Sequence, residues 1–156
     1  MSAVRKSVSA QPDAVDILTE DHARIRALFR RIDQIILTDD IGAKKELVDE
    51  VSKELNIHTV IEEEIFYVAA RKSRHVHYLF DEAEYEHASV TEIIAQLRDL
   101  GAGEPIYDVK VFLLRDYVHR HFTKEEQKIF PKVRRTNLDL VVLGEKLIQR
   151  RQELIR

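Results

Sequence analysis

The sequence contains no cysteine among its 156 residues. Disulfide bonds, zinc sites built from thiolates and thiol catalysis are therefore excluded. Any bound metal must rely on nitrogen and oxygen ligands, which histidine and carboxylate side chains provide. The remaining composition is that of a folded protein, because 44% of the residues are hydrophobic and 34% are charged. A chain of this length can form one domain with its own apolar core.

The sequence also lacks a large excess of either charge and a long apolar run. Its formal net charge is -3, so we expect neither nucleic acid nor an anionic membrane surface as a partner. No run of about 18 apolar residues predicts a transmembrane helix, and the N-terminus lacks the apolar core of a signal peptide. These absences favour a cytoplasmic protein.

No segment alternates between polar and apolar residues as a strand would. Apolar residues instead recur in steps of three and four, the pattern of helices that pack on an interior. This spacing predicts helices at about residues 14–38, 43–72, 75–100, 105–130 and 138–154. Residues 1–12 are polar and are predicted to form a flexible tail, which leaves residues 13–156 as the folded domain. Pro131 is expected to stop or kink the fourth helix.

The breaks between the first four predicted helices are short, so neighbouring helices should run antiparallel. The sequence therefore predicts an all-α fold, namely an antiparallel up-and-down four-helix bundle with an additional C-terminal helix. That last helix could lie across the bundle, and its outer face is a candidate homodimer surface.

Histidine and glutamate occupy interior positions of these helices, where leucine, isoleucine and valine are usual. The first four predicted helices each have one such histidine, namely His22, His58, His87 and His121. Glu62 follows His58 by four residues, which puts both on one helical face. Glu125 stands in the same relation to His121. Counting about 1.5 Å per residue from the helix ends places all six side chains at a similar depth, so they could share one layer.

A single interior histidine is more often a core residue with an ordinary hydrogen-bond partner than a metal ligand. A single His-x-x-x-Glu pair is likewise more often an exposed contact. Two interior glutamates are harder to explain, because burying an unpaired carboxylate costs several kcal/mol. A cation would compensate for them. Imidazole and carboxylate suit iron or manganese, while zinc is an alternative that needs only four ligands in a closed structural site.

Four stretches of the chain resemble a known family. They are Asp21-His22; His58-Thr-Val-Ile-Glu62 with Glu63-Glu64-Ile65-Phe66-Tyr67; Glu86-His87; and His121-Phe-Thr-Lys-Glu125 with Glu126-Gln-Lys-Ile-Phe130-Pro131. On these residues the chain resembles the hemerythrin-like, HHE cation-binding family over about residues 14–151. The resemblance implies two iron ions, joined by an oxo or hydroxo bridge, inside a helical bundle. It also implies that the four interior histidines are terminal ligands and that Glu62 and Glu125 bridge the irons.

The chain departs from the oxygen-carrying hemerythrins at two positions. Those proteins have a further histidine one turn before the one that corresponds to His87, where this chain has Ala83. They also have an aspartate one position after Glu125, where this chain has Glu126. A missing ligand leaves one iron less saturated, which favours an exogenous ligand such as peroxide, nitric oxide or water. Plain reversible storage of oxygen is therefore not expected.

Other polar residues near the ligand set have ordinary interpretations. Expected to be exposed to solvent are Glu63, Glu64, His75, His77 and His119. An additional ligand could come from Glu84, Tyr67, Tyr85 or Tyr117. Solvation of the glutamate and packing of the tyrosines are the alternatives to ligation.

The resemblance favours a non-haem di-iron protein of a stress response, which binds or turns over peroxide, oxygen or nitric oxide and could have catalase-like activity. The alternative is an oxygen or iron sensor, a binding module without turnover. A structural helical bundle without metal is the third hypothesis, and metal analysis distinguishes it from the other two.

Overall fold

The computed structural model describes residues 10–72 and 77–156. Most of the tail predicted at residues 1–12 lies outside the described residues, and so do His75 and the predicted start of the third helix. The described part of the chain contains helices and no strand, which confirms the all-α prediction. The longest elements are α1 (Ala14–Ile35), α2 (Ile41–Ile61), α4 (His77–Asp99), α5 (Pro105–Lys124) and α7 (Leu140–Ile155).

Side chains at the helix starts explain where these elements begin. Asp13 and Asp16 form a capping box at the start of α1, in which each carboxylate accepts a hydrogen bond from the backbone N–H of the other. Asp40 caps α2 and Asp139 caps α7, each by accepting a hydrogen bond from a backbone N–H of the first turn. Pro105 occupies the first turn of α5, where its missing N–H has no helical partner to lose.

Two of the helices continue through a π-helical turn. α2 runs directly into η1 (Glu62–Phe66) and then α3 (Tyr67–Ala70). α5 runs in the same way into η2 (Glu125–Ile129) and α6 (Phe130–Arg134). Of the two effects predicted for Pro131, a stop or a kink, the stop is wrong, because the chain stays helical through this residue. The wider π turn directly before Pro131 relieves the clash that an α-helix would make between the proline ring and the carbonyl one turn earlier.

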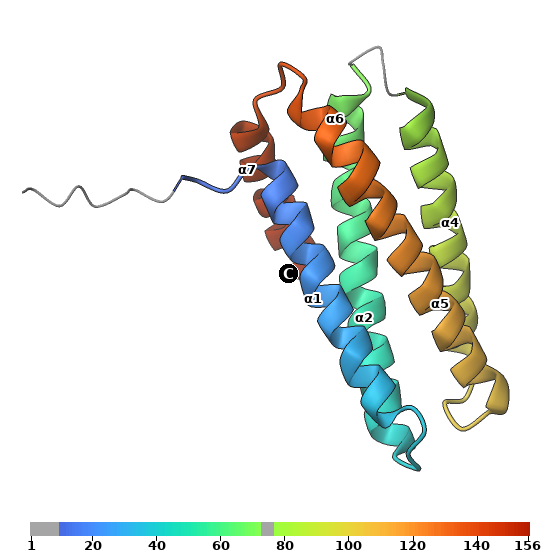
Figure 1. The fold of residues 1–156 in the computed structure, drawn as a ribbon. Coiled ribbons are helices and arrows are strands. Elements are labelled where there is room, and N and C mark those ends of the chain that lie inside the picture. The colour runs from blue at the N-terminus through green and yellow to red at the C-terminus, as the bar shows by residue number, and fades with distance from the viewer. Residues whose placement is uncertain (1–9, 73–76) are drawn as a thin grey trace, which may run out of the picture.

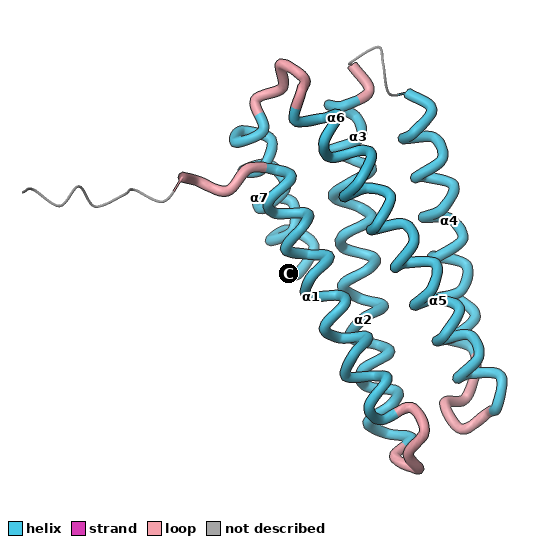
Figure 2. Tube along the Cα trace, in the orientation of Figure 1, coloured by secondary structure: helices cyan, strands magenta, loops and turns pink. Residues whose placement is uncertain are grey.

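Figure 1 shows the long helical runs side by side, with α1 along α2 and α4 along α5. Successive runs point in opposite directions, as the colours from blue through green and yellow to orange show. Further contacts join α1 to α5 and α2 to α4. The runs therefore enclose a common interior, and the loops lie at their ends (Figure 2).

The last helix, α7, packs against α1, α2 and η1. Its Gly144 lies so close to α1 that an added Cβ would stand 2.9 Å from Ile17 Cδ1 and 3.0 Å from the backbone nitrogen of Ala14. Leu147, one turn further on, is fully buried. The homodimer surface expected on this helix stays a prediction, and its outward residues Val142 and Ile148 are exposed.

A polar layer divides the apolar core into two clusters. One cluster includes Ile25, Leu55, Val90 and Val118. The other includes Leu18, Ile61, Ala83 and Ile129. In each long run the interior histidine stands between a residue of one cluster and a residue of the other, as His22 stands between Leu18 and Ile25. The level of this layer is the one expected from the sequence.

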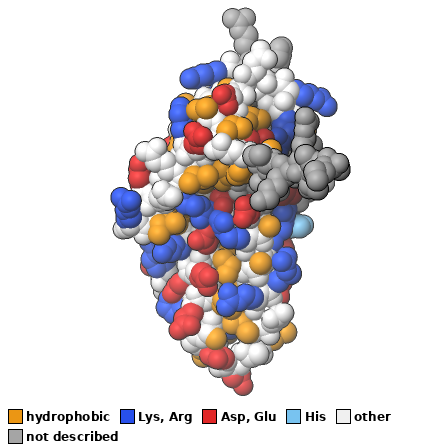
Figure 3. Space-filling model, turned by 90° about the vertical axis from the view of Figure 1, so that its left-hand side faces the viewer, with side chains coloured by type: hydrophobic (Ala, Val, Ile, Leu, Met, Phe, Trp, Pro, Cys, Tyr) orange, Lys and Arg blue, Asp and Glu red, His pale blue; other side chains and the backbone are white. Residues whose placement is uncertain are grey.

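The outer surface carries charges of both signs. On the face that lies to the left in Figure 1, Lys and Arg side chains alternate with Asp and Glu side chains and with small apolar areas (Figure 3). No helix among residues 10–72 and 77–156 combines the length and the apolar character that a membrane span requires.

Candidate metal centre

The six polar residues singled out in the sequence lie together inside the protein. His22 comes from α1, His58 from α2, Glu62 from η1, His87 from α4, His121 from α5 and Glu125 from η2. None of the six is more than 4% exposed to solvent. Buried groups of this kind are expected to be paired or to coordinate a metal.

The donor atoms fall into two groups that share Glu62. In the first group, atoms of His22, His58, Glu62 and Glu125 all lie within 4.8 Å of one another. In the second group, atoms of Glu62, His87 and His121 do so. The carboxylate of Glu62 faces both groups, because its Oε1 lies 3.0 Å from His58 Nε2 and its Oε2 lies 3.0 Å from His87 Nε2.

Glu125 also reaches both groups. Its Oε1 lies 3.4 Å from Nε2 of His22 and 2.9 Å from Nε2 of His121. Two carboxylates thus stand between two pairs of imidazoles. This is the arrangement in which a carboxylate can span two ions, one ion with each pair of histidines.

Four inward atoms of the first group have no hydrogen-bond partner among the described residues. They are His22 Nε2, His58 Nε2, Glu62 Oε1 and Glu125 Oε1. His58 Nε2 lies only 3.0 Å from Glu62 Oε1, yet the contact is not aligned as a hydrogen bond. Leaving such buried atoms unpaired costs about 1–3 kcal/mol each. A cation among them would satisfy all four at once, so the residues fit a metal.

The π turns begin at the two glutamates. The backbone N–H of Tyr67 donates to the carbonyl of Glu62, five residues earlier, and Phe130 makes the same bond to Glu125. Turns of this kind occur often at functional sites. Because the i→i+5 bond stacks Tyr67 over Glu62, it brings a tyrosine to the face of the helix that carries the glutamate.

Tyr67 is the tyrosine that contacts the centre. Its side chain is fully buried. Its hydroxyl oxygen lies 3.1 Å from Glu62 Oε2, 3.0 Å from Glu125 Oε2 and 3.4 Å from His87 Nε2. Burial raises the pKa of Tyr67 well above its usual value, and the two carboxylate charges raise it further. The phenol is therefore neutral and donates to one carboxylate at a time.

A ring of carboxylates holds the outer nitrogens of the four histidines. The Nδ1 atom of His58 lies 3.1 Å from Asp21, and the Nδ1 atom of His87 lies 2.9 Å from Glu63. On the other two helical runs, Nδ1 of His121 lies 2.6 Å from Glu86, and Nδ1 of His22 lies 2.9 Å from Glu126. Each acid comes from the helical run that precedes its histidine around the interior. Such partners fix the imidazoles so that Nε2 points inward.

The ring of carboxylates could not be predicted from the sequence, although one sequence feature is consistent with it. Each acid of the ring is the neighbour in sequence of an interior residue, as in Asp21-His22 and Glu62-Glu63. The expectation that Glu63 is merely solvated is wrong, because it binds His87 on the neighbouring run. Glu64 is exposed as expected, and it binds Arg150 on α7.

Cations stabilise three of the four ring carboxylates. Arg26 binds Glu126 with both of its terminal nitrogens, and Lys124 binds Glu86. Asp21 is held by Arg24 and by Arg151, whose Nη2 lies 2.8 Å from Asp21 Oδ1. No cation of the described residues lies within ion-pair distance of Glu63. The helix α7 thus supports His58 through Arg151 and Asp21.

Electrostatics around the centre raise the pKa values of His58, His87 and His121 and lower those of the acids when no metal is bound, because each group faces groups of the opposite charge. Burial lowers the pKa of His58, but the charge of Glu62 and the hydrogen bond to Asp21 outweigh it and raise that pKa to about 10. Burial likewise raises the pKa of Glu62, yet the histidines around it hold that pKa well below its usual value. The pKa of Glu126 falls to about 2 because it accepts hydrogen bonds from His22 and Arg26. A metal ion would therefore have to displace protons.

Several sequence candidates lie away from the centre. Glu84 binds Arg71 at 2.7 Å and does not join the cluster. Tyr85 is 77% exposed and Tyr117 is 38% exposed, so neither faces the interior. His77 and His119 are exposed as expected, and His75 lies outside the described residues.

An aromatic side chain covers the first group of donors. The ring of Phe122 stacks on His22 with their centroids 3.8 Å apart, and it also meets His58 edge-on. Sequence reasoning did not single out Phe122, because it follows His121 directly and has no chemistry of its own. Its position limits the access of water to this side of the centre.

Comparison with known proteins agrees with this geometry. The family model of the hemerythrin HHE cation binding domain matches residues 13–133, a range that includes all six residues of the cluster. The chain belongs to the hemerythrin HHE cation-binding family, and the resemblance drawn from its sequence is confirmed. Membership of this family and the buried His/Glu cluster together indicate a metal-binding domain.

Similar proteins are found in bacteria. An uncharacterized protein of Mycobacterium tuberculosis is 26% identical over 145 residues, which span 91% of this chain and 87% of that protein. A DNA nickase of a Nostoc species is 25% identical over 122 residues, which span 76% of this chain but only 33% of the nickase, so this chain covers about a third of that relative's length. The crystal structure of a hemerythrin HHE cation binding domain-containing protein from Mycobacterium kansasii has a TM-score of 0.77 at 28% identity and covers 92% of this chain and 87% of that chain.

Proposed function

We propose that this protein is a non-haem di-iron protein that binds or turns over a small oxidant, such as peroxide, oxygen or nitric oxide, in a cytoplasmic stress response. The observation that carries the proposal is the sharing of Glu62 between two groups of buried donors. One group alone would suit one ion. Two groups with a common carboxylate suit a pair.

In this proposal His22 and His58 would hold one iron, and His87 and His121 would hold the other. Glu62 and Glu125, which stand between the two pairs of histidines, would supply carboxylate oxygens to both ions. The scaffold is an antiparallel up-and-down four-helix bundle, which α7 closes on one side. Iron is preferred over manganese or zinc because the family and the mixed nitrogen and oxygen donor set favour it.

The surroundings of the centre support a small ligand. Every donor is buried, so a larger substrate could not reach the ions without opening the fold. Ala83, one turn before His87, offers no donor atom, so the second ion would have only His87, His121 and the two shared carboxylates as side-chain ligands. An exogenous molecule of two or a few atoms would complete the coordination there.

When bound, the iron pair supplies the redox chemistry, and the residues of the chain supply position and protons. Tyr67, with its pKa raised by burial, holds a proton within 3.4 Å of His87 Nε2 and next to both carboxylates. Its hydroxyl can donate a hydrogen bond to a small ligand at the second group. The carboxylates of the ring keep all four imidazoles aimed at the centre.

Metal content and optical spectra of freshly purified protein test this proposal. We expect about two irons per chain, with absorption bands of an oxo-bridged pair that change when peroxide or nitric oxide is added. Rapid breakdown of peroxide would support a catalase-like enzyme. Reversible spectral change without turnover would support a sensor. A metal-free protein that stays folded would contradict both.

A further inference from the structure

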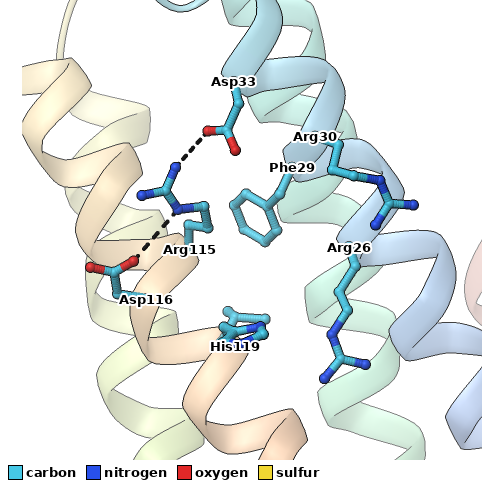
Figure 4. Close-up of a pocket in the computed structure, with 8 residues that line it drawn as sticks. Arg26, Phe29, Arg30, Asp33, Arg115, Asp116 and His119 are labelled. Carbon is cyan, nitrogen blue, oxygen red and sulfur yellow. Dashed lines mark hydrogen bonds and ion pairs between the residues drawn. The ribbon is translucent and has the colours of Figure 1, made fainter.

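A pocket of about 340 Å³ lies between α1 and α5, outside the metal centre. Phe29 and Val118 form its apolar floor, and both are almost fully buried in the core beneath. Figure 4 shows the Phe29 ring directed between the two helices, with Arg115 on one side and His119 at the other end. The volume is that of a site for a small organic molecule.

Two ion pairs between helices mark the ends of this pocket. At one end Arg115 of α5 binds Asp33 of α1 at 2.6 Å and lies 3.5 Å from Asp116. At the other end Arg26 binds Glu126 at 2.6 and 3.1 Å. Both arginines are therefore engaged, and the acids at the first end leave a local excess of negative charge there.

Two further side chains on the pocket wall can donate hydrogen bonds to a ligand. Arg30 projects from α1 one turn after Arg26, and no carboxylate of the described residues lies within ion-pair distance of it. The imidazole of His119 lines the pocket from α5, and its nitrogens have no hydrogen-bond partner among residues 10–72 and 77–156. A guanidinium recognises a carboxylate through parallel N–H donors, and an imidazole can add a further bond.

We propose that this pocket binds a small organic monocarboxylate with an apolar body. The carboxylate lies against Arg30 of α1, and the apolar body extends over Phe29 and Val118 toward His119 at the other end (Figure 4). An inorganic anion would leave the apolar floor uncovered. A ligand with more than one negative charge would be repelled by Asp33 and Asp116, so the pocket favours a single charge.

The position of the pocket also couples it to the metal centre. Arg26 lines the pocket and holds Glu126, and Glu126 in turn lies 2.9 Å from Nδ1 of His22. A carboxylate held by Arg30, one turn from Arg26, competes with Glu126 for the Arg26 guanidinium, and this weakens the contact between Glu126 and His22. This coupling rests on the proposed di-iron centre, whereas binding in the pocket does not.

Calorimetric titration of the metal-loaded full chain tests the binding, with benzoate as the probe and uncharged benzamide and inorganic phosphate for comparison. We expect benzoate to bind at least about tenfold more tightly than either of the others. Arg30→Gln should weaken benzoate binding by about tenfold or more. The matched control is Arg31→Gln, because Arg31 is also exposed but faces Glu50 on α2 at 3.9 Å. That variant should bind benzoate as the unaltered chain does.

Equal affinity for benzoate in the Arg30→Gln and unaltered chains would overturn the proposed binding site, because benzoate would then bind elsewhere, for example at the irons. Benzamide binding as tight as that of benzoate would also overturn it.

For the coupling, benzoate should shift the optical bands of the iron pair in the Arg31→Gln chain but not in Arg30→Gln. Binding without any such shift overturns the coupling alone. Heat of binding in a chain that holds no iron would separate failure of the di-iron proposal from failure of the pocket.

Discussion

The hydroxyl oxygen of Tyr67 lies 3.0 Å from Oε2 of Glu125, although 58 positions separate the two residues in the chain. The equivalent position after the second π turn is held by Phe130, whose backbone makes the same hydrogen bond. The residue after the second π turn therefore has no hydroxyl, whereas the hydroxyl of Tyr67 reaches Glu62, Glu125 and His87.

Replacing Tyr67 by phenylalanine should therefore leave the fold and the iron content unchanged. One hydrogen bond is lost, so the free energy of unfolding should fall by no more than about 1–2 kcal/mol. The reaction of the centre with peroxide should slow by about tenfold, because the proton donor beside the second group is gone. Stopped-flow absorbance and thermal denaturation check the two effects. Tyr85→Phe is the control, since Tyr85 is 77% exposed. Loss of a phenolate-to-iron absorption band on substitution would instead identify Tyr67 as a ligand.

Arg151 and Arg150 offer a matched pair on α7. Arg151 reaches Asp21 and so supports His58, whereas Arg150 binds Glu64 and Glu153 at the surface. Arg151→Met should weaken iron binding severalfold, by less than the roughly tenfold or more expected for loss of Asp21 itself, because Asp21 and not Arg151 is the direct partner of the ligand His58. Competition with a chelator measures the change. Arg150→Met should leave the affinity unaltered, and an equal loss in both variants would mean that α7 acts on stability alone.

Loading of the metal-free protein should release protons. The folded pKa of His58 is about 10, above the 6.5 of the unfolded chain, so at pH 8 the imidazole is charged. A metal ion needs the neutral ring, and roughly one or more protons per chain should appear when ferrous iron is added under argon. A pH indicator in weak buffer records the release. His119→Ala should release as many, because His119 is exposed and outside the cluster.

The same shift sets how the stability of the metal-free protein depends on pH. A pKa that is raised on folding adds stability that is complete below pH 6.5 and disappears as the pH rises through about 10. The melting temperature of the metal-free protein should therefore fall between these values. His58→Gln should remove this part of the slope. A melting temperature that rises over the same range in the unaltered protein would contradict the charge assignment.

Gly144→Ala should loosen α7. The added Cβ would meet Ile17 and the backbone at the start of α1, and overpacking of this kind costs about 1–3 kcal/mol. Gly42→Ala is the control, because its Cβ would have only Asp40 Oδ1 at 3.8 Å. Chemical denaturation compares the two. Equal stability of both variants would show that α7 can shift away from α1 without loss.

The spacing of residues made much of this site accessible from the sequence. Six polar residues at interior positions of four helices predicted a common layer, and the structure brings them together. Tyr67 could not be assigned in this way. In a regular α-helix it stands about 140° around the axis from Glu62, and only the π turn brings it into line.

The ring of outer carboxylates was hidden for a different reason. The partner of an acid such as Glu63 or Glu86 depends on which helix packs beside its own helix and on the relative level of the two. The spacing of residues within one helix predicts neither. The pocket at Phe29 and Arg30 is likewise a product of packing, since its walls come from residues about 80–90 positions apart in the chain.

The proposed centre consists of two ions held between two carboxylates that both ions share. Its most direct test is the iron content of the unaltered chain, measured together with that of Glu62→Gln and of the surface control Glu64→Gln. We predict about two irons per chain for the unaltered protein and for Glu64→Gln, and one or none for Glu62→Gln, with the oxo-bridge bands lost. Two irons and unchanged bands in Glu62→Gln, or a single iron in the unaltered chain, would contradict a centre shared through Glu62.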